Sequence, residues 1–204
     1  MFKKITSKLD IHTLEVLVKS SKTMLVKIAG MIVLLLVSIF LGRTLGSEGL
    51  GIVNFANKFG MILLVFTMFG FQNVIIKFIA IGKEKLDNQG IASVLKTSLI
   101  FNGLLSILIA SIGAIVLPFI LEMWSDNQDL YIPLLIVFVM IIPQTISRVY
   151  GSALNGFGKI WQANLVNQTL SVLLVGLGLI LYWSFNIFFT PISVLLLYAI
   201  SRVL

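Results

Sequence analysis

The chain has 204 residues, of which 58% are hydrophobic and 11% charged, and its formal net charge is +7. Soluble domains carry about 25% charged residues, so this composition is typical of an integral membrane protein. The sequence contains no cysteine, which excludes disulfides, thiolate metal sites and cysteine nucleophiles. Its basic residues are spread between apolar runs, whereas nucleic-acid binders gather them on one solvated face. We therefore expect no nucleic-acid partner, no metal site and no cofactor.

Residues 1–23 form a polar, basic segment, and the rest of the chain is a series of apolar runs of helix length. Such runs are too long for the alternating strands of a membrane barrel. The sequence therefore predicts an all-α, polytopic membrane bundle of about six transmembrane helices over residues 24–204. The expected spans are 24–41, 52–81, 91–121, 130–154, 160–183 and 187–204.

The second expected span is longer than a bilayer requires. It must tilt or bend, and Gly60 and Gly70 are places where a helix can bend. The glycine-rich stretch 42–51 before it predicts a turn, and Pro118 is expected to kink or end the third span.

The distribution of charge predicts the orientation. With six spans, all lysines and arginines except Arg43 and Lys58 fall on the side of the N-terminus. The positive-inside rule places that side in the cytoplasm, so we expect both termini to be cytoplasmic.

Polar residues inside the spans are the candidates for function. One helical face of the second span carries Asn54, Lys58 and Gln72, and the fifth span carries Asn164 and Gln168. The fourth span has a comparable stripe of Gln144, Arg148 and Asn155. Three helices with polar stripes predict a hydrated cavity between them.

A lysine within a span is expensive unless it meets water or an anion. No aspartate or glutamate lies at mid-depth in any span, so we hypothesise that Lys58 binds an anionic substrate group such as phosphate. The alternatives are that Lys58 snorkels outward, that the amides only join helices, and that Arg148 is an interfacial anchor. The lack of carboxylates argues against paired-carboxylate catalysis, and no nucleotide-binding, metalloprotease or nucleophile-elbow motif is present. We do not expect an enzyme.

Three stretches resemble one family. LGRTLGSEGLGIVNFA, with Leu45, Gly46, Glu48, Leu50 and Gly51, is similar to the junction of the first two spans in polysaccharide-biosynthesis flippases. MFGFQNVIIKFIA and GSALNGFGKIWQANLVNQ resemble two further segments of that family. The resemblance is to the Wzx-type members of the multidrug/oligosaccharidyl-lipid/polysaccharide exporter superfamily.

The resemblance implies two six-helix lobes around a central cavity, of which this chain would supply the N-terminal lobe. It implies flipping of an undecaprenyl-diphosphate-linked oligosaccharide across the bacterial cytoplasmic membrane, for O-antigen, capsule or teichuronic-type polysaccharide. The cavity residues would be Lys58, Asn54, Gln72, Asn164 and Gln168, with Arg43 near the outer mouth.

The expected partners are the lipid-linked substrate, the bilayer, and a missing C-terminal lobe or a second copy, because a chain of one lobe reads as a fragment or a truncated gene. Three alternatives remain open: a multidrug/cation antiporter, a peptidoglycan-precursor flippase, and a non-transporting structural subunit. A polysaccharide polymerase or ligase fits less well, because the expected outer loops are short and acidic.

Overall fold

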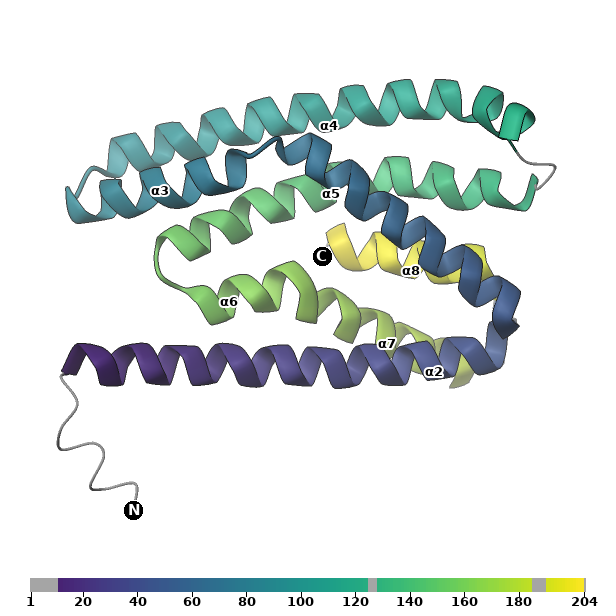
Figure 1. Cartoon of the computed structure of the whole chain (residues 1–204), viewed down its shortest axis with the longest axis horizontal. Helices are drawn as coiled ribbons and strands as arrows, with labels where there is room; N and C mark the ends of the chain where they lie inside the picture. Colours follow the sequence, from purple (N-terminus) through teal and green to yellow (C-terminus); the bar gives the residue numbers. More distant parts are fainter. Residues whose placement is uncertain (1–10, 125–127, 185–189, 204) are drawn as a thin grey trace, which may run out of the picture.

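The computed structural model describes residues 11–124, 128–184 and 190–203, and these ranges are helical with short turns and no strand (Figure 1). The helices are α2 (Ile11–Met68), α3 (Phe71–Glu84), α4 (Asn88–Trp124), α5 (Tyr131–Gly156), α6 (Ile160–Asn164), α7 (Leu170–Ser184) and α8 (Pro191–Val203). A 3₁₀ turn (Gln128–Leu130) precedes α5, and a π-helical turn (Leu165–Thr169) joins α6 to α7. The prediction of an all-α membrane helix bundle is confirmed.

Helix α2 bends back on itself at Gly46. This residue has φ 70° and ψ −174°, a conformation that is almost restricted to glycine. No atom lies within 4 Å of the place where its Cβ would be, so the backbone angle alone requires glycine. The first half of α2 (residues 11–45) and the second half (residues 47–68) therefore cross the molecule in opposite directions (Figure 1). The predicted turn over 42–51 is concentrated in this one residue.

The expected second span is broken between Met68 and Phe71. Phe69 has φ 39° and Gly70 has φ 79°, and these left-handed residues end α2 and start α3 in a new direction. Of the two glycines considered for a bend, Gly70 makes it. Gly60 stays helical and buried, and a Cβ on it would lie 3.1 Å from Val137. The break matters because residues before and after it no longer share one helical face.

The remaining spans follow hydropathy closely. Within the described residues, four helices are long and apolar enough to cross a membrane, and Pro191–Arg202 is a shorter apolar helix. Helix α4 continues through Pro118 to Trp124, so this proline does not end the third span, and the alternative that it kinks the helix stays a prediction. Part of the expected sixth span, residues 187–189 and 204, lies outside the described residues.

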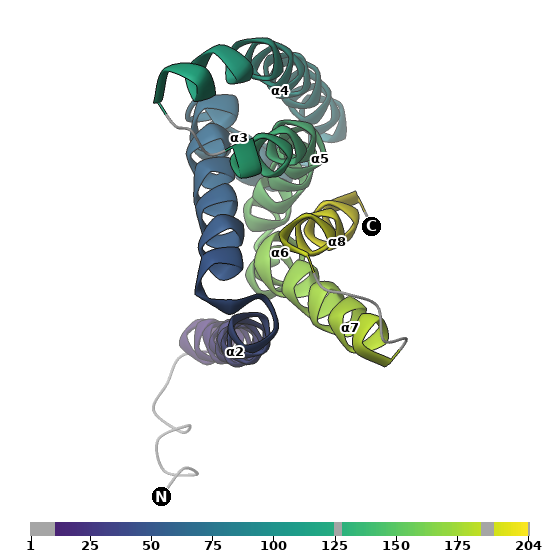
Figure 2. The same cartoon turned by 90° about the vertical axis from the view of Figure 1, so that its right-hand side faces the viewer.

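Helix α5 is the centre of the bundle. In the most apolar stretch of α5, 56% of the residues are buried, compared with 11% in the most apolar stretch of α4. One apolar cluster packs α5 against α3, α4 and the end of α2, around Ile79 and Ile141. A second packs it against both halves of α2, α7 and α8, around Val53 and Leu195. Figure 2 shows α5 between α3 and α4 on one side and α7 and the first half of α2 on the other.

Candidate functional site: a basic cavity beside α5

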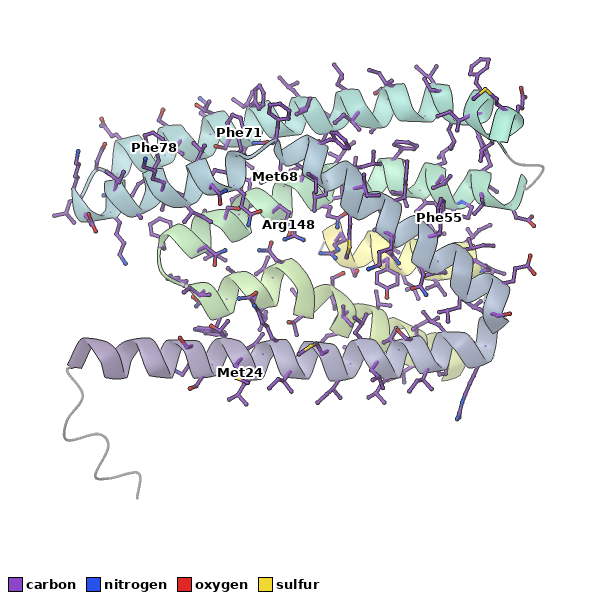
Figure 3. All side chains as sticks on the ribbon, viewed as in Figure 1. Met24, Phe55, Met68, Phe71, Phe78 and Arg148 are labelled. Carbon is purple, nitrogen blue, oxygen red and sulfur yellow. The ribbon has the colours of Figure 1, made fainter. Side chains whose placement is uncertain are left out.

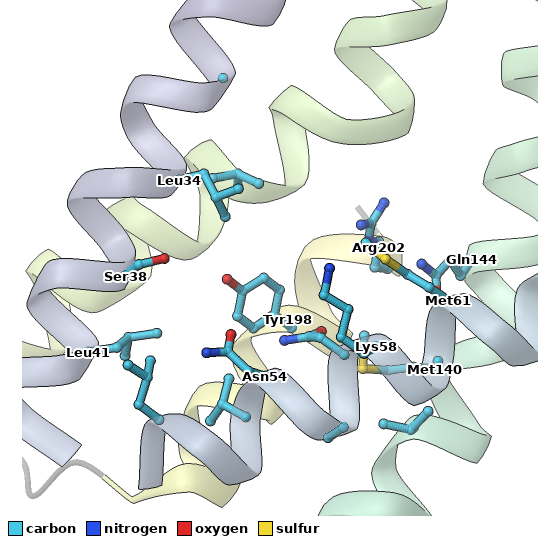
Figure 4. A pocket seen from close by; sticks show the side chains of 18 of the residues that line it. Leu34, Ser38, Leu41, Asn54, Lys58, Met61, Met140, Gln144, Tyr198 and Arg202 are labelled. Carbon is cyan, nitrogen blue, oxygen red and sulfur yellow. The ribbon is translucent and has the colours of Figure 1, made fainter. Parts of the chain in front are cut away.

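A cavity of about 480 Å³ opens between the two halves of α2, α5, the start of α7 and α8 (Figure 4). Its walls carry three basic side chains, Lys27, Lys58 and Arg202. They also carry amide and hydroxyl groups: Ser38, Asn54, Asn57, Gln144, Thr169 and Tyr198. No described aspartate or glutamate lines it. The cavity is therefore a polar, positively charged space inside an apolar bundle.

The second half of α2 supplies the densest polar wall. Asn54 and Lys58 are four residues apart and so lie on one face of this helix. On the adjacent face, Val53 and Ala56 are almost fully buried, which fixes the rotation of the helix. Figure 4 shows Lys58 extending into the same opening as Tyr198 and Arg202. An ammonium held this way is accessible to a ligand in the cavity.

Helix α8 supplies the facing groups. Tyr198 and Arg202 are again four residues apart, and both line the cavity. The hydroxyls of Ser171 and Ser201 share a hydrogen bond of 2.7 Å, which joins α7 to α8 inside the bundle. One Nη of Arg202 donates to the backbone oxygen of Asn167 at 2.9 Å. These contacts hold Arg202 at the cavity wall.

Of the six site residues expected from the sequence, the structure brings Asn54 and Lys58 together in the cavity. Gln72 follows the Gly70 break and is exposed on α3, and Arg43 is exposed near the Gly46 bend. Asn164 donates its Nδ2 to the backbone oxygen of Ile160 at 2.9 Å. These three do not line the cavity, and the side chain of Gln168 lies outside the described part of the structure. The binding roles given to all six residues stay predictions.

Sequence reasoning missed several lining residues. Lys27, near the start of the first expected span, was not selected as a site residue, yet it lines the cavity. Arg202 and Tyr198 were not selected, although their four-residue spacing in an apolar run is the same signal as that of Asn54 and Lys58. Gln144 belonged to the polar stripe expected on the fourth span, and it does face the cavity.

A family model described as "Polysaccharide biosynthesis protein" matches residues 16–204. The match includes every residue that lines the cavity. No curated protein and no solved structure matches the chain.

Proposed function

Because this chain belongs to the polysaccharide biosynthesis protein family, we propose that it flips a lipid-linked oligosaccharide across a bacterial cytoplasmic membrane for the synthesis of cell-surface polysaccharide. The observation that carries the proposal is the basic, polar cavity of about 480 Å³ within a membrane helix bundle. Such a cavity serves transport better than bond cleavage, because it offers binding groups without a carboxylate pair or a metal cluster among the described residues.

The chemistry of the substrate explains why these groups are needed. A polyprenyl-diphosphate-linked oligosaccharide has an apolar tail, a charged diphosphate and a sugar that is hydrated in water. Moving the diphosphate and sugar through hydrocarbon is costly unless other groups replace the water. Asn54, Asn57 and Ser38 can hydrogen-bond the sugar hydroxyls, and Lys58 and Arg202 can neutralise phosphate oxygens. The prenyl tail would stay in the bilayer.

The proposed mechanism is alternating access between two lobes. Parallel six-helix repeats around a central site are an established plan among transporters. The described helices, with the basic cavity between them, would form one side of the transport pathway, and a second lobe or a second copy of this chain would form the other. Rocking of the two walls would open the cavity to one leaflet and then to the other. The partners under this proposal are the lipid-linked substrate, the bilayer and that second wall.

The described charges favour a cytoplasmic N-terminal end. Lys83, Lys85 and Lys159 lie at the α3–α4 and α5–α6 connections, which Figure 1 shows at the same end as the start of α2. Glu48 and Asp129 lie at the other end, near the Gly46 bend and the start of α5. The positive-inside rule places the lysine-rich end in the cytoplasm.

Deletion of the gene in its host tests the proposal. We expect surface polysaccharide to fall and lipid-linked repeat units to accumulate in the membrane, because synthesis of the units continues while their export stops. Unchanged levels of both pools would remove the support for flipping. Altered drug sensitivity with both pools unchanged would favour the multidrug antiporter instead.

A further inference from the structure

Three buried polar atoms without partners gather where α5, the π-helical turn and α8 meet. They are Nε of Arg148, Oδ1 of Asn167 and Nε of Arg202, and none has a hydrogen bond within the described structure. Figure 3 shows Arg148 between α5 and α6. A buried polar group left unpaired destabilises the fold, and a charged group does so more strongly. The two Nε–H groups are donors that an anion can satisfy, whereas Oδ1 of Asn167 is an acceptor and needs a separate donor.

Packing holds these side chains together. Arg202 donates to the backbone oxygen of Asn167 at 2.9 Å. The carboxamide of Asn167 occupies the space that a Cβ on Gly151 would fill. Gly151 lies three residues after Arg148, on the same face of α5. Arg148 and Arg202 therefore flank Asn167 from two helices, and they are close enough for their like charges to interact.

The π-helical turn gives Asn167 this position. A π turn inserts one extra residue into a helix, and such turns are frequent at functional sites. Here the turn (Leu165–Thr169) contains Asn167, which therefore reaches Gly151 on α5 and Arg202 on α8.

No described carboxylate neutralises the pair. The acidic side chains that the structure describes lie near helix ends, away from the cavity lining: Glu48, Glu84, Asp87, Glu122 and Asp129. Of the three residues Arg202 lines the cavity, so a ligand meets the cluster at this side chain. Two guanidinium groups suit an anion with several oxygens, because each presents a planar fork of N–H donors.

We propose that Arg148 and Arg202, held together beside Asn167, form a binding site for a phosphate or diphosphate group at the edge of the cavity that Arg202 lines. The anion accepts hydrogen bonds from Nε of both arginines, and it cancels their repulsion. The existence of this site does not depend on the proposed function. Only the identity of the molecule that carries the phosphate rests on that function. A lipid headgroup and a free phosphate share the chemistry that this site recognises.

Titration of the purified full chain tests the site. Inorganic diphosphate is expected to raise the melting temperature, whereas chloride at equal ionic strength is not. Arg148→Gln and Arg202→Gln should each weaken the apparent affinity about tenfold or more, the order expected for a hydrogen bond to a charged group. Lys159→Gln, which removes one exposed charge at the α5–α6 connection, should leave the affinity unchanged. Equal affinities in all four proteins would overturn the proposal.

A second arm distinguishes the source of the phosphate. The same proteins are placed in phosphatidylcholine nanodiscs with or without undecaprenyl diphosphate. Stabilisation by this lipid with no response to inorganic diphosphate assigns the site to a headgroup, and an equal response to both assigns it to the anion alone. Either result supports the site if Arg148→Gln abolishes it. No stabilisation of the wild type by either probe rejects it.

The stability of the ligand-free variant distinguishes a binding role of Arg148 from a structural one. In anion-free buffer Arg148→Gln should melt at the wild-type temperature or above, because it removes a partly buried charge that no described carboxylate compensates. A clear loss of stability would show that Arg148 is structural, and would overturn its assignment. Diphosphate binding that depends on both arginines, together with unchanged polysaccharide pools after gene deletion, would keep this site and remove the proposed function.

Discussion

Lys58 is the residue on which the transport proposal depends most directly. Its side chain lines the cavity from the second half of α2, and it is exposed there rather than packed. Lys58→Ala should therefore lower the flux of lipid-linked oligosaccharide about tenfold, the order expected for one hydrogen bond to a charged group, with little change in protein abundance. Surface polysaccharide at matched protein level measures this effect, and Lys58→Arg should restore most of it.

The matched control is Lys96→Ala, which removes an exposed charge on α4 outside the cavity. It should leave transport unchanged. If Lys58→Ala lowers abundance and transport in equal proportion, the lysine has a structural role and the proposed contact with the substrate is wrong.

At the scale of single residues, the sequence predicts correctly that Asn54 and Lys58 share one helical face. Asn54 and Lys58 lie within one uninterrupted helix, so their four-residue spacing fixes them on one face. Gln72 was placed on the same face by continuing the helical phase through Phe69 and Gly70. The left-handed angles there reset the phase. Arg202 could not be assigned to the cavity from sequence alone, because its place depends on how α8 packs against α7.

At the scale of elements, hydropathy locates the helices because burial in a bilayer requires about 20 consecutive apolar residues. Hydropathy does not locate the breaks between helices, because a glycine that bends the chain and a glycine that stays helical look alike in the sequence. Gly46 and Gly70 adopt positive φ, whereas Gly60 packs within a helix against Val137. Only the tertiary arrangement separates these cases. Pro118 shows the same limit, because the sequence predicted a kink or an end and α4 continues past it.

The Gly46 bend gives a prediction about stability. Gly46→Ala places a Cβ at φ 70° and ψ −174°, and we expect it to destabilise the fold by about 1–3 kcal/mol. Gly51→Ala is the control, because Gly51 is helical and has open space around its Cβ position. That change should stabilise by about 0.5–1 kcal/mol, the helix preference for alanine. Thermal unfolding in detergent compares the two, and equal melting temperatures would contradict the role given to Gly46.

At the scale of the whole molecule, α5 separates two different environments. On its α3–α4 side the packing is an apolar cluster around Ile79 and Ile141. On its other side, α8 and the second half of α2 enclose the basic cavity. A substrate in the cavity therefore contacts elements joined mainly through α5. This arrangement fits a wall that moves as a unit, as alternating access requires.

The proposed direction of flipping depends on the orientation of the bundle, which is simple to measure because the chain has no cysteine. Ser47→Cys places a single thiol beside the Gly46 bend, and Lys85→Cys places one at the α3–α4 connection; both positions are exposed. With cytoplasmic termini, a membrane-impermeant maleimide should label Ser47→Cys in intact cells. It should label Lys85→Cys only after permeabilisation, because the lysine-rich end faces the cytoplasm. The unsubstituted chain has no thiol and serves as the control. The reverse pattern would show an inverted bundle, in which the side richer in lysine faces outward and the proposed direction of flipping loses its basis. Labelling of both thiols in intact cells would place both ends outside and contradict a membrane crossing between residues 47 and 85.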